Sequence, residues 1–366
     1  MTKVVLLIPT LDRSGAEKQF TLLATRLPRD EFDVHVVALT RGGPYAEAIR
    51  SSGLPLTVLN KRFRFDPLAL YRLRRLLGKI KPDILHTWLF AANSYGRMLA
   101  GEKSRPKVIV SERCVDTWKA SWQLAVDRRQ ISRTSRLIGN SQGVADFYRD
   151  QGYPAEKTVV IPNGVEIPEA NSFERDALLE ELDVPAGSRL VGYVGRLAKQ
   201  KRCKDLIWSM QLLRQLTDRV YFVLFGDGPE RSRLEQLAKH MGCDHLVRFM
   251  GHRDDTIRFT RAFDVFWLAS DFEGMSNSIM EAMAAGVPVV ASDIGPNREL
   301  VVDGETGYIV KVGDTAGFAQ FTDRLLADSE LKQRLGTAAL QRAKNEFSVE
   351  NMVNSHAALY REVTGE

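Results

Sequence analysis

The chain has 366 residues, more than one hydrophobic core usually serves, so two domains are expected. Hydrophobic residues make up 44% and charged residues 27%, which excludes a disordered or fibrous protein. The net charge of +5 is mildly basic and suits phosphates, nucleic acid or an anionic membrane face without choosing among them. The sequence has neither an apolar run of about 18 residues nor a recognisable secretion signal, so we expect a cytoplasmic protein.

Cysteine and histidine spacing points away from disulfides and metals. Cys114, Cys203 and Cys243 are odd in number and far apart, and the six histidines do not cluster. We predict free thiols and no bound metal.

Short apolar runs alternate with helical patterns from the N-terminus onward, which is typical of βαβ units and a parallel sheet. In the first half we predict strands at Val4–Pro9, Val34–Leu39, Leu56–Leu59, Ile84–Trp88, Val108–Val110 and Leu137–Gly139. Helices are predicted between them at Ala16–Leu27, Pro67–Lys79, Ala91–Leu99 and Gln142–Gln151.

The turn-rich stretch Ile161–Glu169 interrupts this pattern, which then starts again. The second set of predicted strands is Leu190–Val194, Tyr221–Phe225, Val247–Met250, Val265–Ala269 and Val287–Ala291. The second set of predicted helices is Lys204–Leu216, Pro229–Met241, Asn277–Ala285 and Gly317–Leu326. The rest is helical, with breaks expected near Gly336 and Phe347–Ser348, and we expect the last helix, about Glu350–Val363, to return to the first domain.

The richest loop after a strand runs from Asp271 to Glu281. Ligands of open α/β sheets bind at the carboxyl ends of strands, where helix N-termini attract phosphate or sugar oxygens. Ser276 or Asn277 is placed to cap the helix, and Gly274 permits close backbone approach. Glu273 in the loop and Glu281 one turn into the helix can contact different parts of one ligand. The alternative is that these acids only stabilise the helix start, by about 0.3–1 kcal/mol each.

Two more loops of the second half follow strands. Gly195–Lys201 contains Arg196 and Lys201, which suit a diphosphate whose leaving charge must be neutralised, although solvated surface charge is the alternative. Phe225–Pro229 reads mainly as a tight turn, with Pro229 as the first residue of the next helix.

In the first half, Thr10–Glu17 links the first strand to the first helix, but Gly15 is its only glycine and the dinucleotide fingerprint is absent. This counts against a nicotinamide-dependent oxidoreductase, and hydrolase and P-loop motifs are also missing. His86 and Arg113 lie at the ends of strands and are candidates for an acceptor pocket. The alternatives are a satisfied half-buried histidine and an arginine in a salt bridge.

Together these segments resemble glycosyltransferase family 4, the large group of retaining enzymes with the GT-B fold, over nearly the whole chain. Ser14–Glu17 resembles the family's glycine-rich loop, and Lys157–Val165 resembles its interdomain segment. Gly195–Lys201 and Phe225–Glu230 match two further elements, and Glu273–Glu281 fits the E-x7-E signature. Ser14 in place of the first glycine, and Arg113 where many members have histidine, are departures from the pattern.

The resemblance implies two Rossmann-like domains that face each other across a cleft: an acceptor domain at 1–167 plus the terminal helix at about 349–366, and a donor domain at 168–348. Arg196 and Lys201 would hold the donor diphosphate, Glu281 the ribose, and Glu273 the donor sugar near its anomeric carbon. Gly15 would face the diphosphate. Backbone amides around the helix start would bind sugar or phosphate oxygens, in the segment Gly274, Met275, Ser276, Asn277 and Ser278. No metal and no other cofactor are implied.

The expected function is therefore retaining transfer of a hexose or N-acetylhexosamine from a nucleotide diphosphate, UDP or GDP, to a lipid-linked or saccharide acceptor. The alternative is a catalytically weak nucleotide-sugar-binding subunit of a complex. Nucleic acid is not expected as a partner. The basic, amphipathic segment Lys61–Lys81 suggests contact with an anionic membrane on its cytoplasmic face. Its alternative is a helix that buries its leucines on the sheet.

Overall fold

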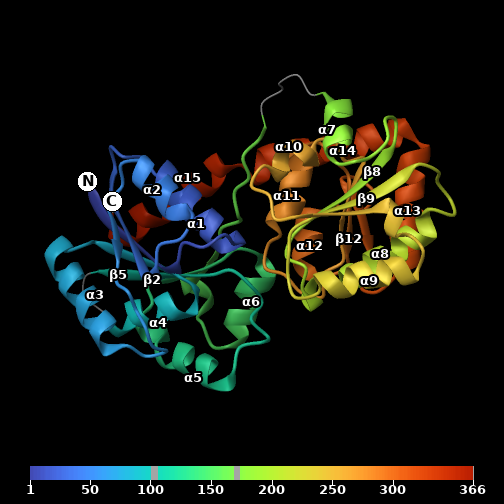
Figure 1. The fold of residues 1–366 in the computed structure, drawn as a ribbon. Helices are drawn as coiled ribbons and strands as arrows, with labels where there is room; N and C mark the ends of the chain where they lie inside the picture. Colours follow the sequence, from blue (N-terminus) through green and yellow to red (C-terminus); the bar gives the residue numbers. More distant parts are fainter. Residues whose placement is uncertain (100–105, 169–173, 366) are drawn as a thin grey trace. The chain divides into compact units, whose positions relative to one another are not determined.

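The computed structural model describes residues 1–99, 106–168 and 174–365. The chain forms two compact units, Met1–Gly164 with Val349–Glu366, and Val165–Ser348 (Figure 1). Each unit is a parallel sheet with helices, so the predicted pair of doubly wound α/β domains is confirmed.

The sheet of the first unit has the strand order β3-β2-β1-β4-β5-β6-β7, and its paired strands run parallel. Its order reverses between β1 and β4, the switch point at which doubly wound sheets bind ligands. The strands are β1 Thr2–Thr10, β2 Phe32–Arg41, β3 Leu56–Val58, β4 Ile84–Trp88, β5 Lys107–Glu112, β6 Arg136–Gly139 and β7 Thr158–Val160. The helices are α1 Gly15–Arg26, α2 Tyr45–Ser51, α3 Pro67–Ile80, α4 Leu89–Leu99, α5 Ser121–Arg129, α6 Gln142–Asp150 and α15 Val349–Thr364.

The sheet of the second unit has the order β10-β9-β8-β11-β12-β13, again with parallel pairs. The strands are β8 Arg189–Val194, β9 Val220–Phe225, β10 Val247–Gly251, β11 Val265–Leu268, β12 Val289–Ser292 and β13 Gly307–Val310. The helices are α7 Arg175–Glu181, α8 Cys203–Leu213, α9 Arg231–His240, α10 Thr256–Thr260, α11 Asn277–Ala284, α12 Gly295–Leu300, α13 Thr315–Ala327 and α14 Ser329–Glu346.

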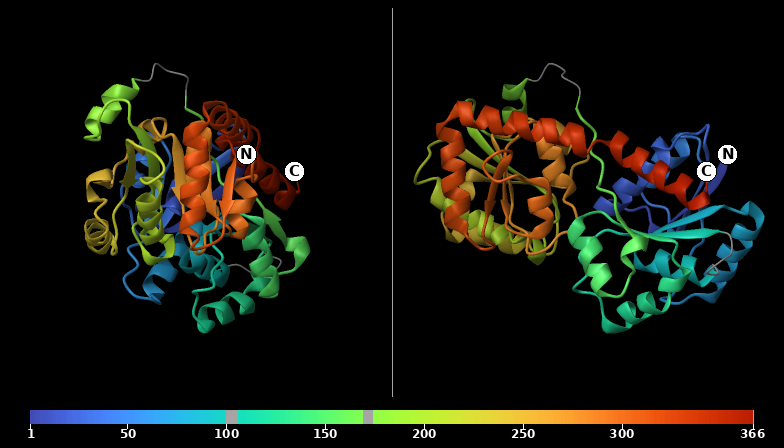
Figure 2. Two further views of the ribbon diagram at one scale, coloured as in Figure 1. Left: turned by 90° about the vertical axis from the view of Figure 1, so that its right-hand side faces the viewer. Right: turned by 180° about the vertical axis from the view of Figure 1, so that it is seen from behind.

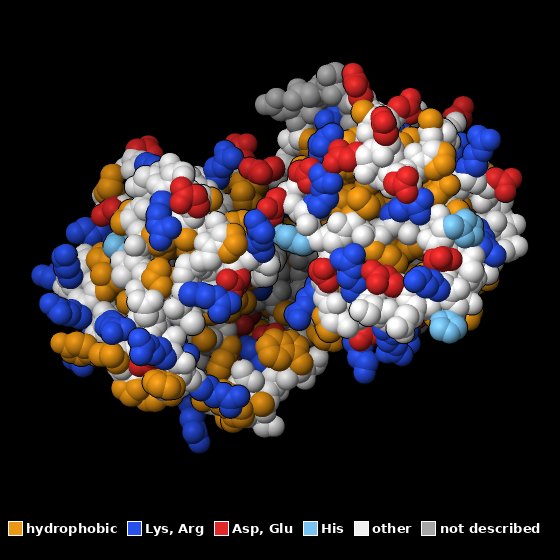
Figure 3. All heavy atoms as spheres, in the orientation of Figure 1, with side chains coloured by type: hydrophobic (Ala, Val, Ile, Leu, Met, Phe, Trp, Pro, Cys, Tyr) orange, Lys and Arg blue, Asp and Glu red, His pale blue; other side chains and the backbone are white. Residues whose placement is uncertain are grey.

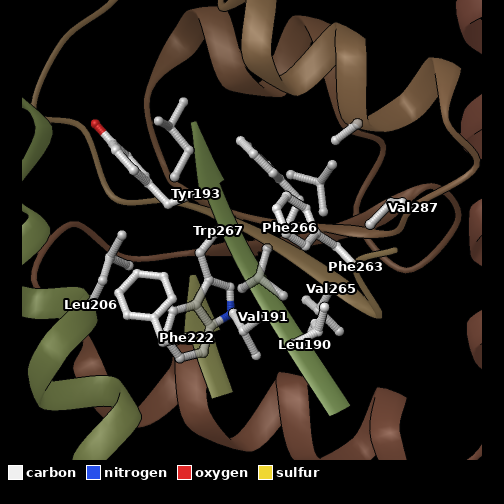
Figure 4. Close-up of a cluster of buried hydrophobic side chains, with 14 of the residues drawn as sticks. Leu190, Val191, Tyr193, Leu206, Phe222, Phe263, Val265, Phe266, Trp267 and Val287 are labelled. Atoms are coloured by element: carbon white, nitrogen blue, oxygen red, sulfur yellow. The ribbon is translucent and has the colours of Figure 1, made fainter. Parts of the chain in front are cut away.

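The core of the second unit explains why its strands read as continuous apolar runs. Helices cover both faces of a parallel sheet, so side chains on both faces of each strand are buried. Figure 4 shows Val191, Phe222 and Trp267 packed together in this core. The polar atom of the Trp267 ring is satisfied, because its Nε1 donates to Thr322 Oγ1 at 2.7 Å.

Each predicted strand has a counterpart, but β7 and β13 were not predicted. β7 has three residues and runs directly into the turn-rich stretch. β13 begins at Gly307, where a Cβ atom would lie 2.2 Å from the carbonyl oxygen of Val289 on the neighbouring strand. Glycine there permits close strand approach, although in the sequence it reads as a turn residue. Pro229 is also not the first residue of a helix, because α9 begins at Arg231.

The predicted break near Gly336 is wrong, because α14 continues through it. A Cβ atom on Gly336 would lie 2.2 Å from the carbonyl oxygen of Gly286. The glycine therefore allows the backbone of α14 to approach the loop after α11. The break predicted at Phe347–Ser348 is correct, since α14 ends at Glu346 and α15 begins at Val349.

Substituting Gly336 with alanine is expected to destabilise the second unit by about 1–3 kcal/mol, because the added methyl group forces backbone atoms apart. Gly78→Ala is the matched control, since Gly78 also lies in a helix but its added Cβ would meet nothing within 4 Å. That substitution should stabilise α3 by about 0.5–1 kcal/mol. Amide hydrogen exchange in α14 and α3 measures both effects, and equal effects of the two changes would contradict this account of Gly336.

The terminal helix α15 packs on the first unit, as predicted from the sequence, and lies beside α1 (Figure 2). Met352, Val353 and Tyr360 are buried in the same core as β1 and β2. At its far end, Arg361 pairs with Glu31 at 2.7 Å. The first unit is therefore built from the two ends of the chain.

Candidate functional site

The loops that follow β8 and β9 in the second unit are joined by backbone hydrogen bonds. The amide of Gly195 donates to Phe225 O and that of Leu197 donates to Asp227 O, both at 2.9 Å. Gly226 has a φ of +130°, and a Cβ atom there would lie 2.0 Å from the carbonyl oxygen of Gly195. Gly226 thus allows the backbones of these two loops to touch.

Arg196 lies at the exposed tip of the loop after β8. The Tyr193 hydroxyl donates to the backbone oxygen of Arg196 at 3.0 Å, which fixes the loop from below. Burial raises the pKa of Tyr193 well above its usual range, so the hydroxyl stays a donor. Among the residues described, the Arg196 guanidinium has no ion-pair partner, and it can therefore bind an anion.

Lys201 and Glu273 form an ion pair at the carboxyl ends of β8 and β11. Their side chains are 18% and 11% exposed, so the pair is largely withdrawn from water. The Ser270 hydroxyl donates to the same carboxylate oxygen at 2.6 Å. An ammonium group carries three donors, so Lys201 can hold Glu273 and still contact a phosphate.

The two loops that carry this ion pair are fastened to each other on either side of it. Gln200 Nε2 donates to Phe272 O at 2.6 Å, and the amide of Asp271 donates back to Gln200 O at 2.9 Å. Arg202 adds an ion pair with Asp271 at 2.9 Å. The positions of Lys201 and Glu273 are therefore set by backbone contacts as well as by their own attraction.

The N-terminus of α11 lies directly after Glu273. Ser276 is its N-cap, as predicted, and its hydroxyl accepts from the amide of Ile279 at 3.4 Å. Gly274, Met275 and Ser276 are buried, whereas Asn277, Ser278 and Glu281 are partly exposed. The structure thus places the predicted segment on one loop and one helix start, with its amides at the positive end of the helix dipole.

A cavity of 610 Å³ lies beside these loops. Its lining includes Gln200, Arg202, Asp271 and Phe272 but none of Arg196, Lys201, Glu273 and Glu281. It is therefore a neighbouring feature of the loops and not the location of the predicted residues.

In the first unit, Gly15 begins α1 and is exposed. Ser14 is the N-cap residue, but its hydroxyl contacts Glu17 instead of the helix amides. The Thr10 hydroxyl also donates to Glu17, at 3.2 Å. The serine that departs from the family's glycine thus takes part in a side-chain cluster at the helix start.

His86 is fully buried on β4 and does not reach the surface. Its ring nitrogens lie 2.6 Å from the Tyr360 hydroxyl and 2.8 Å from Ser111 Oγ. Burial lowers the pKa of His86 well below its usual value, so the ring is neutral. This favours the satisfied histidine over the acceptor contact. Its partner Tyr360 lies on α15, far away in the sequence, so no local pattern indicates the pairing.

Arg113 follows β5 and is 8% exposed. It lies over the Trp88 ring, with 4.2 Å from the guanidinium carbon to the ring centroid, and donates to Asn163 Oδ1. The salt bridge considered from the sequence is not found among the described residues.

The described residues contain neither a metal-binding cluster nor a membrane-spanning helix. Within residues 1–99, 106–168 and 174–365, no group of three or more histidine, cysteine, aspartate or glutamate residues is arranged to hold a metal ion. Over the same residues, no helix combines the length and apolar character needed to cross a bilayer.

Two family models match consecutive parts of the chain. Residues 13–168 match the family described as Glycosyltransferase Family 4, and residues 174–342 match Glycosyl transferases group 1. The two matches correspond closely to the two α/β halves.

Among curated relatives, the lipopolysaccharide core biosynthesis glycosyltransferase LpsE of Rhizobium meliloti (strain 1021) is 33% identical over 62% of this chain and 64% of its own length. The N-acetyl-alpha-D-glucosaminyl L-malate synthase of Bacillus anthracis is 30% identical over 52% of this chain and 50% of its own length. LpsD of the same Rhizobium strain, also a lipopolysaccharide core biosynthesis glycosyltransferase, is 31% identical over 94% of both chains.

Solved structures share the fold. Anabaena Alr3699/HepE, crystallised in complex with UDP, superposes with a TM-score of 0.88 at 23% identity, covering 99% of this chain and 100% of that one. Sucrose-phosphate synthase from Thermosynechococcus elongatus superposes with a TM-score of 0.80 at 21% identity, covering 100% of both chains. These likenesses establish the GT-B fold. The match to LpsD over nearly the whole chain, together with the two family models, shows that this protein belongs to the family 4, group 1 glycosyltransferases.

Proposed function

We propose that the chain is a retaining hexosyltransferase that uses a UDP- or GDP-sugar and needs no metal ion. The observation that carries the proposal is the Lys201–Glu273 ion pair, held at the start of α11 beside the loop of Arg196. It combines cations for a leaving diphosphate with a fixed carboxylate for a sugar that becomes positively charged.

Each residue has a distinct role in this proposal. Arg196 and Lys201 neutralise the diphosphate, and Glu281 binds the ribose hydroxyls. Glu273 contacts the donor sugar near its anomeric carbon, and the amides of Gly274–Ser278 bind sugar or phosphate oxygens. Gly15 permits close backbone approach of the diphosphate. Cations and a helix N-terminus can supply the charge stabilisation that a metal ion gives in other enzymes.

The transfer itself is proposed to occur on one face of the sugar, with an ion-pair-like transition state. The bond between the anomeric carbon and the phosphate oxygen breaks, and the acceptor oxygen bonds to that carbon from the same face, which preserves its configuration. The leaving phosphate oxygen takes up the proton of the acceptor hydroxyl. A hexose or N-acetylhexosamine is the proposed cargo. A lipid-linked or saccharide alcohol is the proposed acceptor, in line with the lipopolysaccharide core enzymes among the relatives.

The test is to incubate the pure protein with a panel of UDP-, GDP- and ADP-sugars, with and without EDTA, and to measure nucleotide release. Release that persists in EDTA is expected with one class of nucleotide. Nuclear magnetic resonance of the product then gives the anomeric configuration. Binding without release, even with added saccharide or lipid-linked acceptors, would favour the nucleotide-sugar-binding subunit instead.

We also propose that the first unit contacts an anionic membrane through the segment Lys61–Lys81. α3 buries Ala69, Leu73 and Leu77 but leaves Leu68 and Tyr71 more than half exposed, at 54% and 61%. Its leucines are thus divided between the sheet and the surface. Four further aromatic residues are exposed in the described part of the same unit: Phe63 and Phe65 before α3, Trp118 before α5, and Trp122 in the first turn of α5.

These aromatic residues are interleaved with cations. Arg64 lies over the ring of Trp122 at 5.6 Å, which joins the segment to α5. Figure 3 shows hydrophobic and basic side chains side by side over α3 and α5. Aromatic side chains favour the interfacial region of a membrane, and basic side chains favour anionic lipid headgroups. The surface therefore suits one face of an anionic bilayer.

The double substitution of Phe63 and Phe65 by serine is expected to weaken binding to phosphatidylglycerol-containing vesicles by about tenfold or more, because two aromatic anchors are lost. Leu216→Ser is the matched control, since Leu216 is 56% exposed but lies in the second unit. Vesicle sedimentation measures the binding. Equal binding of both variants, or equal binding to neutral phosphatidylcholine vesicles, would contradict the proposal.

A further inference from the structure

Arg113 is a buried cation with unused hydrogen-bond donors. It is 8% exposed, and its Nη2 donates to Asn163 Oδ1. Its Nε and Nη1 atoms have no hydrogen-bond partner in the described part of the chain. A guanidinium carries five N–H donors, and these two atoms hold three of them.

The charge of Arg113 is also unbalanced. No carboxylate pairs with it among the described residues, and burial alone lowers its pKa to about 9. The neighbouring histidine rings do not balance this charge. Burial lowers the pKa values of His86 and His356, and the charge of Arg113 lowers them further, so both rings are neutral. Burying a guanidinium without a counter-ion is costly, so a buried arginine is normally paired with an anion.

Arg97 in the same unit shows how this chain treats a buried arginine that has a structural task. Arg97 is 0% exposed, but it pairs with Asp127, donates to the Tyr153 hydroxyl and donates to Asn93 O at 3.0 Å. The stacking of Arg113 on Trp88 is worth about 0.5–2 kcal/mol, and it satisfies none of the free N–H groups. A structural role therefore accounts for the contacts of Arg113 with Trp88 and Asn163. It does not account for the N–H groups on Nε and Nη1, which have no partner among the described residues.

Arg113 lies at the carboxyl edge of the sheet of the first unit. It follows β5, and its contacts Trp88 and Asn163 lie at the end of β4 and shortly after β7. Asn140, which follows β6, donates to Arg113 O at 3.3 Å, and its own Oδ1 has no partner among the residues described. These residues share the carboxyl edge of the sheet, next to the switch point between β1 and β4, where doubly wound sheets bind their ligands.

We propose that Arg113 binds an anionic group of the substrate, a phosphate or a carboxylate, at this edge of the first unit. Two sources carry that chemistry: an anionic acceptor, such as one with a phosphate near its reacting hydroxyl, and a donor sugar with a carboxylate. The inference rests on the proposed transferase function, because that function makes the bound anion part of a substrate. Anion binding by Arg113 can be tested without turnover.

The first experiment titrates the full chain, labelled with ¹⁵N-arginine, with inorganic phosphate at constant ionic strength, chloride being the balancing anion. The Arg113 Nε–H resonance is assigned by its loss in Arg113→Gln. We expect it to shift saturably with phosphate. The control is Arg136→Gln, because Arg136 lies in the same unit, is 27% exposed and pairs with Glu362. It should leave the shift unchanged. No saturable shift, or similar shifts of many arginine resonances, would overturn the proposal.

The second experiment locates the source of the anion by steady-state kinetics. Arg113→Gln is expected to raise KM by about tenfold to a hundredfold for the substrate that carries the anion, and to leave KM unchanged for its neutral analogue. Arg113→Lys should recover part of the loss. The paired comparisons are phosphorylated against unphosphorylated acceptors, and UDP-glucuronate against UDP-glucose.

The outcomes are separable. A selective rise with one pair supports the proposal and names the source. A fall in UDP affinity with equal effects on both members of each pair would assign Arg113 to the donor diphosphate and overturn it. If the chain turns over no nucleotide sugar, the proposed function fails, while the phosphate titration still decides whether Arg113 binds an anion.

Discussion

Replacing Glu273 with glutamine is expected to lower the rate of sugar transfer by about 10²–10³-fold and to change the affinity for UDP by less than about threefold. Glutamine keeps the size of the side chain and can still accept from Ser270, which donates to Glu273 at 2.6 Å. It removes the negative charge that would face the positively charged sugar in the transition state. The free nucleotide has no such sugar, so its binding should be nearly unchanged.

The measurement pairs single-turnover transfer with calorimetric titration of UDP. Glu235→Gln is the matched control, because Glu235 is a surface carboxylate of the same unit that pairs with Arg231 at 2.9 Å. It should alter neither quantity. If Glu273→Gln weakened UDP binding as strongly as it slowed transfer, Glu273 would act through the nucleotide and the role proposed for it would be wrong.

The second large effect concerns acid stability of the first unit, through His356. This histidine is fully buried on α15, where its Nδ1 lies 2.8 Å from Met352 O. Burial lowers its pKa from 6.5 to about 3. In the unfolded chain it protonates below its ordinary pKa, whereas in the folded chain it stays neutral. Its contribution is therefore fully present above pH 6.5 and is lost as the pH falls towards 3, by roughly 5 kcal/mol in total.

Amide hydrogen exchange of β4, compared between wild type and His356→Leu, isolates this contribution. The opening free energy of wild type should fall more steeply between pH 6.5 and pH 4 than that of the variant. The comparison with the variant is needed because Glu112 changes stability in the opposite direction. Burial raises the pKa of Glu112 to about 7, so its contribution to stability falls as the pH rises from 4.5 to 7. His240→Gln, a surface change in the second unit, should follow wild type. Parallel slopes in wild type and His356→Leu would refute the assignment.

The sequence predicts the strands and long helices well because their signal is local. Val265–Leu268, for example, is an apolar run that is buried on both faces of a parallel sheet. Such a run can be recognised in the sequence without knowing which strands lie beside it. Short elements and the roles of glycines are harder to predict from the sequence. Gly336 reads as a helix breaker, and its close contact with Gly286 depends on the packing of two segments that are far apart in the sequence.

The same division holds for the candidate site. Lys201 and Glu273 could be placed together from their motifs, and the structure brings them into contact. Ser270 was missed, although it follows a predicted strand directly, where a small polar residue is a usable signal. Asn163 beside Arg113 and Tyr360 beside His86 gave no local signal, because each pair joins segments that only the folded sheet brings together.

The return of α15 has a consequence for how the protein is made. The ribosome completes residues 165–348, which have their own sheet and core, before the last helix emerges. Until then β4 lacks Tyr360, the partner of the buried His86, and the core around β1 lacks Met352 and Val353. The middle of the chain can therefore fold during synthesis, whereas the N-terminal part becomes complete only once α15 has been synthesised. A nascent chain without its final helix would expose that unfinished core to chaperones and proteases.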